Sequence, residues 1–315
     1  MKRFNQRELL IEVARLYYYQ HLTQEQVGEA LGISRQKVSR LLNRAYEEGI
    51  VQIRIAESLS PLSQMEGELC QKFGLKEIKI ARLFAREEYL ATRRIAQEAA
   101  YFLVNKLEPY TTLGVAYGKT LYEMTNFLTR RLIPGLRVIQ IMGGYGKLKG
   151  EVMSIELAQR IADAFEGDVV FLLAPAFCRD EKTKKAIEGE ERIRRVLDLA
   201  RRADVALVGI GGLEPTSTLM DTGDIQEDEK EELLHHGAVG NICGNFYNQL
   251  GEPVASRADE RRIGVTIADL KKISQVVGVA GGEKKFSAIL GALRGKLITT
   301  IITDELTAEK LLKVE

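Results

Sequence analysis

The sequence has little of the chemistry that metal sites and nucleophilic catalysis need. Its 315 residues include three histidines, three cysteines and no tryptophan. The cysteines, Cys70, Cys178 and Cys243, are odd in number and far apart, which excludes a zinc-ligand or redox spacing. They indicate buried structural thiols in a reducing compartment. No nucleophile elbow or metal-ligand cluster occurs, so we expect no catalytic residue, no metal and no cofactor.

Targeting and membrane-spanning segments are also missing. The basic residues at the start, within 1–8, are not followed by the apolar core of a signal peptide. The longest apolar run, 169–177, is too short to span a bilayer. We therefore expect a cytoplasmic protein without a membrane partner.

Positive and negative charges are balanced over the whole chain, but they are distributed unevenly between its two ends. The formal net charge is +1, which excludes a global basic field. Residues 1–55 hold nine Lys and Arg against six Asp and Glu, a net of +3, and the remainder holds 36 against 38, a net of −2. Serines and a proline interrupt the pattern between 58 and 63. We expect two domains, 1–57 and 58–315, of which the first is a small basic head suited to nucleic acid.

The stretch 22–55 has the pattern of a helix-turn-helix. Two short amphipathic helical patterns flank Gly32, a residue suited to the tight turn between two steeply crossing helices. Thr23 and Ser34 are placed to cap the first and the second helix. The alternation of apolar and polar residues in 51–55 predicts a wing strand, so the head is predicted to be a winged helix-turn-helix.

The second of these helices carries the candidate DNA-binding side chains. It holds four cations and no acid before Glu47, above an apolar stripe. Such a helix fits the major groove of double-stranded operator DNA, where cations neutralise phosphates while amides and guanidinium groups read base edges. Base-edge contacts are predicted for Arg35, Gln36, Ser39 and Arg40, and phosphate contacts for Lys37, Arg44 and Thr23, with Gln24 and Ser34 completing the set. The alternative is an ordinary amphipathic hairpin with a solvated basic face.

From residue 76 onward, strand and helix patterns alternate. Near-continuous apolar strands separated by helices predict an α/β domain whose mostly parallel sheet is covered on both faces. Strands are predicted at 77–81, 112–116, 137–142, 168–173, 205–210, 276–280 and 297–303, and a further strand at 241–248 is predicted to pair with 262–266. Helices are predicted at 5–20, 63–73, 87–107, 119–128, 152–165, 188–203, 227–235, 284–293 and 307–312. The helix at 63–73 is either a dimer-forming helix or the ordinary first helix of the large domain.

Glycines follow four of the predicted strands. The loops are Gly118-Lys119-Thr120, Gly143–Gly146, Gly211-Gly212 and Gly281-Gly282. Ligands of open α/β sheets bind at the carboxyl ends of the strands, and glycine lets a phosphate approach the backbone closely. The set of loops therefore favours a phosphorylated small molecule, and plain turn chemistry is the alternative for each loop alone. A nucleotide-binding P-loop is excluded, because Leu113 stands where its first glycine is needed.

Several longer motifs occur along the chain. The head contains ISRQKVSRLLNRAYEEGIVQIRI, and the large domain contains GVAYGKTL, MGGYG, VGIGG, GAVGNICGNFY and VAGGEKKFSAILGALRG followed by LITTIITDELTA. In these motifs, and over nearly its whole length, the chain resembles the SorC-type family of bacterial sugar-responsive transcription factors, which includes sorbitol-operon and deoxyribonucleoside regulators. The resemblance implies that the large domain is similar to sugar-phosphate isomerases and deaminases and binds an effector without turnover.

The resemblance also implies the residues of an effector site. Phosphate would be bound by 118–120 and by Lys285, and the sugar would lie against 143–146. This sequence departs from the family pattern at Ala116 and Tyr117, where a serine or threonine and a tryptophan are common, and at Asn241, where an acid commonly holds sugar hydroxyls. The predicted effector-binding residues are Gly118, Lys119, Thr120, Gly143, Gly144, Tyr145, Gly211, Gly212, Asn241 and Lys285.

These observations lead to two hypotheses from different classes. In the first, the chain is a transcriptional regulator of a carbohydrate or nucleoside catabolic operon. A phosphorylated sugar binds the large domain and changes the spacing of two heads in a homo-oligomer, a dimer or a tetramer. In the second, the chain is a sugar-phosphate isomerase or deaminase with an accessory DNA-binding head, although fold alone does not carry function. A helix-turn-helix protein whose large domain only oligomerises is a further alternative.

Overall fold

The computed structural model describes residues 6–51, 61–83, 87–144, 148–214 and 217–314. The chain divides into two compact units, residues 1–58 and 59–315, one residue beyond the boundary expected from the sequence. The predicted wing strand at 51–55 and the predicted effector residue Tyr145 lie outside the described residues, apart from residue 51 itself.

The smaller unit is a bundle of short helices. Helix α1 (Gln6–Ala14) continues into a π-helical turn, Arg15–Tyr19, so the helix predicted at 5–20 is present with a widened last turn. Helices α2 (Gln24–Leu31) and α3 (Arg35–Glu47) follow at the predicted positions. The three helices share one core, formed by Leu10, Val13, Leu16, Val27, Val38, Leu41, Leu42 and Ala45.

Local signals set the turn between α2 and α3. The Thr23 hydroxyl accepts a hydrogen bond from the Gln26 amide at 3.2 Å, and the Gln26 side chain accepts one from the Thr23 amide at 2.9 Å, which completes a capping box. Gly32 ends α2 with a φ of 66°, in the left-handed region that glycine tolerates. A side chain at Gly28 would meet the Ile33 carbonyl oxygen at 2.6 Å, so glycine lets the turn pack closely on α2.

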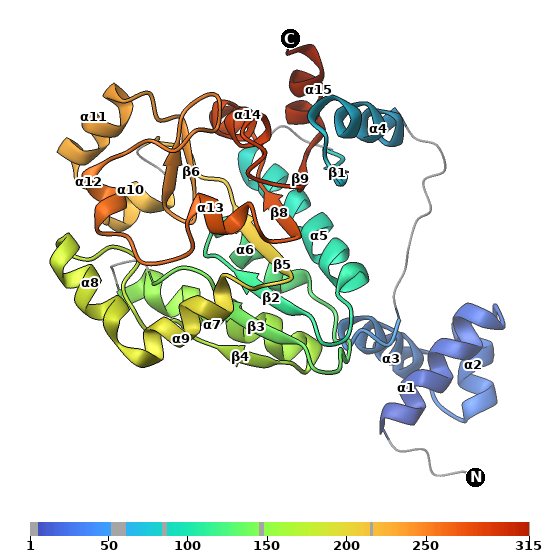
Figure 1. The fold of residues 1–315 in the computed structure, drawn as a ribbon. Coiled ribbons are helices and arrows are strands. Elements are labelled where there is room, and N and C mark those ends of the chain that lie inside the picture. The colour runs from blue at the N-terminus through green and yellow to red at the C-terminus, as the bar shows by residue number, and fades with distance from the viewer. Residues whose placement is uncertain (1–5, 52–60, 84–86, 145–147, 215–216, 315) are drawn as a thin grey trace. The chain divides into compact units, whose positions relative to one another are not determined.

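The larger unit is built on a seven-stranded sheet, and the predicted parallel α/β architecture is confirmed (Figure 1). All six strand pairs are parallel. In spatial order the strands are β1 (Glu77–Ala81), β9 (Thr300–Asp304), β8 (Gln275–Val279), β5 (Val205–Gly209), β2 (Thr112–Val115), β3 (Arg137–Gln140) and β4 (Asp168–Val170). From β2, the chain adds β3 and then β4 toward one edge of the sheet. The next strand, β5, lies on the opposite side of β2.

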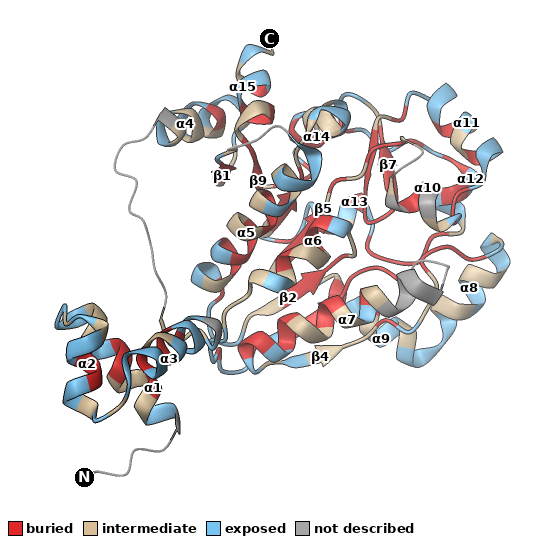
Figure 2. Ribbon diagram, turned by 180° about the vertical axis from the view of Figure 1, so that it is seen from behind, coloured by how far each residue is buried: buried red, intermediate tan, exposed pale blue. Residues whose placement is uncertain are grey.

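Helices cover both faces of this sheet. One face packs against α5 (Glu88–Lys106), α6 (Lys119–Met124) and α7 (Leu148–Phe165). The other packs against α4 (Pro61–Phe73), α9 (Glu191–Ala200), α13 (Ile267–Leu270), α14 (Phe286–Arg294) and α15 (Glu305–Lys313). Neighbouring residues of one strand enter opposite cores, as Leu207 and Val208 do in β5, which explains why the strands read as continuous apolar runs. Buried residues accordingly follow the strands in Figure 2.

The segment between β5 and β8 was predicted less well. The strand predicted at 241–248 is instead a hairpin of β6 (Gly240–Ile242) and β7 (Asn245–Tyr247). Its turn uses positive φ angles at Cys243 (51°) and Gly244 (67°), as tight hairpin turns require. The predicted pairing with 262–266 is wrong, because that segment makes only isolated bridges to Met142 and Phe177.

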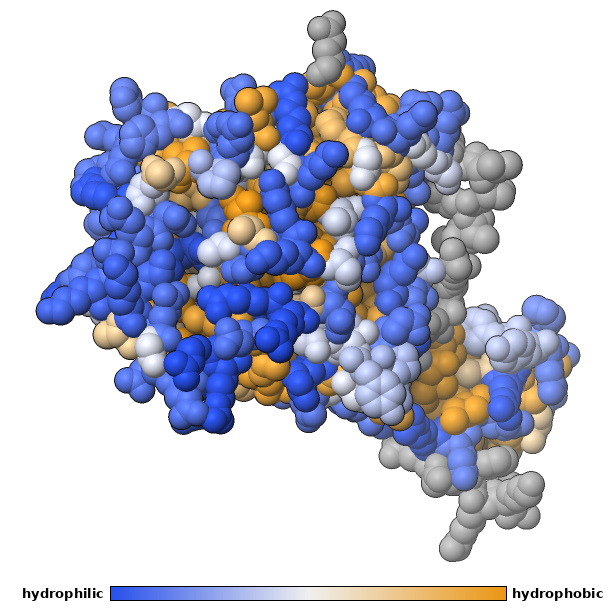
Figure 3. Space-filling model, in the orientation of Figure 1, coloured by the Kyte–Doolittle hydropathy of each residue, from blue (hydrophilic) through white to orange (hydrophobic). Residues whose placement is uncertain are grey.

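Short polar helices account for most of the other differences. The structure has α8 (Glu181–Gly189), α10 (Thr218–Thr222) and α12 (Arg257–Glu260) where no helix was predicted to begin, whereas α11 (Glu227–His235) matches its prediction. The helix predicted at 188–203 is interrupted at Glu190, whose ψ of 129° is extended. Polar side chains cover much of the face of the larger unit drawn in Figure 3, with smaller apolar areas between them. Among the described residues, no helix is long and apolar enough to cross a membrane.

Candidate functional site

Helix α3 presents a cationic face above a buried stripe. Val38, Leu41, Leu42 and Ala45 are buried, whereas Arg35, Gln36, Lys37, Arg40 and Arg44 are exposed and Ser39 is half-buried. Arg44 differs from the other cations, because its Nε lies 2.5 Å from the Glu48 carboxylate. Among the residues that the structure describes, the cations at the start and middle of the helix, Arg35, Lys37 and Arg40, have no carboxylate partner.

The remaining predicted DNA-binding residues lie at helix starts. The hydroxyls of Thr23 and Ser34 both act as caps, and the Ser34 hydroxyl accepts from the Lys37 amide at 3.3 Å. Gln24, the first residue of α2, is half-buried. The two caps fix where α2 and α3 begin. Contacts with base edges remain the predicted role of Arg35, Gln36, Ser39 and Arg40.

In the larger unit, the sheet order brings the glycine loops together. Strands β8, β5, β2 and β3 are consecutive neighbours and parallel, so the loops that follow them lie along one edge of the sheet. The order of the strands reverses between β2 and β5, which is where open α/β sheets form a crevice. Gly118, after β2, and Gly209, at the end of β5, face each other there, since a side chain at Gly118 would lie 3.9 Å from the Gly209 Cα.

Asn241 joins this edge from the β6–β7 hairpin. It exchanges two backbone hydrogen bonds with Gly211, which follows β5. Its buried side chain covers Gly211, where an added Cβ would meet the Asn241 Nδ2 at 2.7 Å. Two residues predicted from separate signals are thus in direct contact.

The two lysines that precede α14 have different surroundings. The Lys284 Nζ lies 2.9 Å from the Glu88 carboxylate of α5 and is paired. Lys285 is half-buried, and burial lowers the pKa of Lys285 below its usual 10.5. The carboxylates of Glu214 and Glu88 oppose this shift in pKa, while the nearby Lys119 adds to it. Lys285 therefore shares the edge of the sheet with Lys119 and Glu214.

We call Gly118–Thr120, Gly211-Gly212, Asn241 and Lys285 the cradle. Lys119 is exposed and Thr120 is buried within it. The turn before Lys285 is held by Asp304 at the end of β9, whose carboxylate accepts from the Gly282 amide at 2.8 Å and from the Thr307 amide at 2.9 Å. Asp304 therefore caps α15 and fixes the loop that carries Lys285.

Gly143 and Gly144 are bonded to neighbouring segments of the protein. The Gly143 amide donates to the Ile263 carbonyl at 3.2 Å and the Gly144 amide donates to the Ala174 carbonyl at 2.9 Å. A side chain at Gly143 would meet the Pro175 carbonyl oxygen at 2.4 Å. These glycines allow close packing of the neighbouring segment, and their amides are occupied by protein carbonyls rather than offered to an anion.

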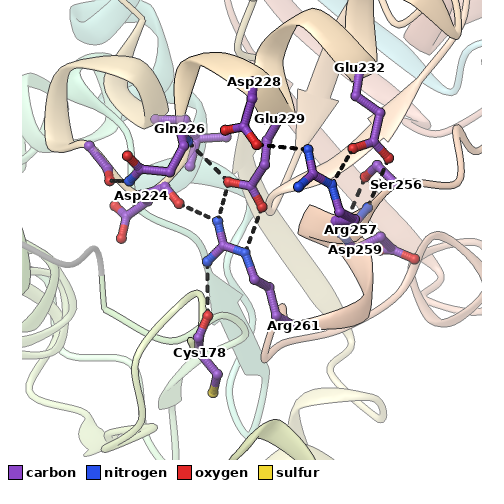
Figure 4. A network of polar contacts seen from close by, with 12 residues as sticks. Cys178, Asp224, Gln226, Asp228, Glu229, Glu232, Ser256, Arg257, Asp259 and Arg261 are labelled. Atoms are coloured by element: carbon purple, nitrogen blue, oxygen red, sulfur yellow. Dashed lines mark hydrogen bonds and ion pairs between the residues drawn. The ribbon is translucent and has the colours of Figure 1, made fainter. Parts of the chain in front are cut away.

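A cavity of about 450 Å³ lies apart from the cradle, among α10, α11, α12 and the 177–179 loop. Arg261 binds the Glu229 carboxylate through Nε at 2.8 Å and Nη2 at 2.6 Å, and also donates to the carbonyls of Cys178 and Asp224 (Figure 4). Arg257 pairs with Asp228 and Glu232 beside it. Because these lining charges are already paired, the cavity offers no uncompensated charge for a phosphate. Among the described residues, no group of three or more His, Cys, Asp or Glu side chains is arranged to hold a metal.

Comparison with known proteins identifies the family. Residues 58–313 match the family described as "Putative sugar-binding domain", and residues 5–48 match sigma-70 region 4. The chain is 33% identical to the deoxyribonucleoside regulator of Bacillus subtilis (strain 168), over 96% of this chain and 97% of that protein. The chain belongs to the SorC-type family.

Other members of the SorC-type family agree with this assignment. The chain is 31% identical to the sorbitol operon regulator of Klebsiella pneumoniae, over 97% of this chain and 98% of that protein. The crystal structure of the full-length sorbitol operon regulator SorC from Klebsiella pneumoniae matches with a TM-score of 0.80 at 29% identity, covering 99% of this chain and all of that one. The likeness therefore covers both units of the chain.

Proposed function

We propose that this chain is a DNA-binding transcriptional regulator of a carbohydrate or nucleoside catabolic operon, controlled by a phosphorylated sugar that binds residues 58–315. The observation that carries the proposal is the meeting of Lys119, Lys285 and glycine-rich turns at the crevice between β2 and β5. A phosphate bound there would lie beside two lysine side chains and could approach the backbone at Gly118, where an added Cβ would meet nothing closer than 3.9 Å. The family relationship supports this function, since the relatives are named as regulators of sorbitol and deoxyribonucleoside operons.

The roles of individual residues follow from the same geometry. Lys119, Thr120 and Lys285 bind the phosphate, with Gly118 leaving room for it. Asn241, held against Gly211-Gly212, contacts the sugar hydroxyls, and its amide can both donate and accept hydrogen bonds. The sugar lies against the loop at 143–146. The amides of Gly143 and Gly144 do not donate to it, because both already donate to protein carbonyls.

Control of DNA binding requires more than one head. The protein acts as a homo-oligomer, a dimer or a tetramer, whose α3 helices enter successive major grooves about one helical turn apart. Effector binding changes the spacing of the heads, and this couples the two sites through a difference in operator affinity. No turnover of the effector is proposed, and incubation of sugar phosphates with the protein should leave them unchanged.

The direct test uses full-length protein and operator DNA obtained by selection from a random duplex library. Operator affinity is measured by fluorescence anisotropy with and without each of a set of phosphorylated sugars. In Lys285→Met, the response to the active sugar phosphate should be lost while the affinity without effector is retained. Lys284→Met is the matched control, because Lys284 is paired with Glu88 outside the cradle. A normal response in Lys285→Met would overturn the effector site.

A further inference from the structure

The two edge strands of the large sheet differ in how their outer sides are covered. Strands β1 and β4 lie at opposite ends of the strand order. Helix α4 packs against β1, where the Glu66 carboxylate accepts a hydrogen bond from the Ile80 amide at 3.0 Å. An uncovered edge strand offers unpaired N–H and C=O groups to other chains, and natural proteins cover or charge such an edge. The edge at β1 is therefore covered within the chain.

Strand β4 keeps an outer row of backbone groups. The Asp168 amide donates to the Leu136 carbonyl at 2.9 Å, so Asp168 and Val170 turn their backbone groups toward β3. Alternation along the strand then turns those of Val169 and Phe171 outward. Among the described residues, β4 pairs with β3 alone, and no hydrogen bond joins Val169 or Phe171 to a segment beyond the edge. Figures 1 and 2 show β4 at the rim of the sheet from both sides.

The side chains of this edge are apolar. Residues 169–178 include no charged side chain. Val169 and Phe171 pack against one core of the sheet and Val170 against the other, and all three are half-buried. Leu173, just beyond the strand, is 66% exposed. The edge therefore lacks the charges that keep edge strands apart in solution, and it is suited to pairing with another strand.

Two copies of β4 are complementary to one another. If they run antiparallel across a two-fold axis at Val170, Val169 of one protomer lies opposite Phe171 of the partner subunit, and the outward groups of these residues exchange hydrogen bonds. A β-branched residue opposite an aromatic one also stabilises a sheet. Asp168 lies opposite Leu172 of the partner subunit, so no like charges face each other. The same short segment thus supplies both halves of an apolar, hydrogen-bonded interface.

We propose that β4 is a self-association edge, at which two copies of this chain join their sheets across a two-fold axis. This inference rests on the proposed function, because it names a surface for the homo-oligomer required there. A two-fold axis makes one patch of surface serve both protomers. It is also the symmetry with which a pair of α3 helices meets the two half-sites of a palindromic operator.

The first test is disulfide cross-linking of full-length protein. In the proposed register the two copies of Val170 form a pair without mutual hydrogen bonds, with Cα atoms about 4.5 Å apart, which a disulfide can bridge. Val170→Cys should therefore give a covalent dimer on oxidation with copper phenanthroline, seen on a non-reducing gel. Val169→Cys is the matched control, because its two copies lie diagonally, about 7–8 Å apart, and should not be bridged. The unmodified protein gives the background from its own cysteines.

The second test removes outward hydrogen bonds. Val169→Pro deletes an amide that points away from β3, and an edge strand tolerates proline at such a position. Sedimentation of full-length protein over a concentration series should show the dissociation constant of the β4 contact raised by roughly tenfold to hundredfold, the size expected for two lost hydrogen bonds. Val169→Thr keeps the amide and the branched shape, and should change it by less than about threefold. Circular dichroism checks that both variants fold.

The outcomes separate this interface from the rest of the proposed function. Cross-linking at position 170 no greater than at position 169 overturns the β4 edge, and so does a folded Val169→Pro that associates as Val169→Thr does. The cross-linking decides alone if Val169→Pro does not fold. An oligomer that persists through either failure uses another surface, and the proposed function stands. A chain that is monomeric both free and on operator DNA overturns the homo-oligomer together with the edge.

Discussion

Gly211 and Asn241 lie thirty positions apart in the chain and are joined by two backbone hydrogen bonds. The Gly211 amide donates to the Asn241 carbonyl at 3.0 Å, and the Asn241 amide donates to the Gly211 carbonyl at 2.8 Å. This exchange fastens the β6–β7 hairpin to the end of β5, and the Asn241 side chain fills the space over Gly211. The position of Asn241 in the cradle therefore depends on the absence of a side chain at Gly211.

Replacement of Gly211 by alanine tests this dependence. The new Cβ would lie 2.7 Å from the Asn241 Nδ2, so the buried amide must move. We expect Gly211→Ala to lower the free energy of unfolding by about 1–3 kcal/mol, as overpacking of a core does, and to weaken the effector response. Gly189→Ala is the control, since a Cβ there meets nothing within 4 Å. Urea unfolding curves that coincide for the two variants would contradict the expectation.

Arg40 and Arg44 provide a matched pair on α3. Arg40 is exposed on the cationic face, whereas Arg44 already pairs with Glu48 at 2.5 Å. Arg40→Ala should weaken operator binding by roughly 1–3 kcal/mol and relax specificity at one base pair, if it reads a guanine. Arg44→Ala should weaken binding less and equally for all sequences. Anisotropy titrations with the selected operator and with single-base variants of it measure both effects, and unchanged affinity in Arg40→Ala would remove this residue from the reading set.

The Arg261–Glu229 pair should be sensitive to the loss of one partner. Their side chains are 14% and 8% exposed, and Arg261 also donates to two backbone carbonyls. Arg261→Met leaves a buried carboxylate uncompensated and should destabilise the fold by about 3 kcal/mol. Arg257→Met, at a guanidinium that is 57% exposed, should cost less than about 1 kcal/mol. Adding Glu229→Gln to Arg261→Met should restore part of the loss, and thermal unfolding that ranks the two single variants the other way would contradict this account.

The contrast between these features shows how far the sequence could predict the molecule. The caps at Thr23 and Ser34 and the turn at Gly32 depend on residues within a few positions, so the starts of both helices and the turn between them were predicted correctly. The strands of the large sheet were recognised because each contains a run of apolar residues, and central strands such as β5 are apolar on both faces. Their order could not be read from the chain, yet this order is what brings Gly118, Gly211 and Lys285 to one edge.

The features that were missed depend on contacts between distant residues. Arg261 and Glu229 read as ordinary surface charges, and only the fold shows that they meet and are buried. The β6–β7 hairpin was taken for one strand because its turn, Cys243-Gly244, is short and lies within an apolar stretch. Asn245 stabilises this turn by donating to the Ile242 carbonyl at 2.9 Å and to the Val265 carbonyl at 3.0 Å, and the latter contact has no local signature.

The lowered pKa of Lys285 predicts how effector binding depends on pH. The pKa of Lys285 is lower in the folded protein than the usual 10.5. At pH values below the folded pKa, its ammonium group therefore destabilises the fold. This destabilisation is lost as pH rises from the folded pKa toward 10.5. A phosphate binds the ammonium form more tightly than the neutral amine, so affinity should be full at pH values below this lowered pKa and should fall as pH rises through it. Bound phosphate stabilises the ammonium, so binding in that window should take up protons. Calorimetry in two buffers of different ionisation enthalpy measures this uptake.

Lys285→Arg provides the control for this prediction, because a guanidinium stays protonated throughout the accessible range. Effector affinity in this variant should be nearly independent of pH where the affinity of the unmodified protein falls, and its proton uptake should vanish. Lys119 is exposed, so Lys119→Arg should leave the pH dependence in place. If the decline in affinity persists in Lys285→Arg, the pH dependence does not come from Lys285, and the phosphate is not bound by its ammonium group.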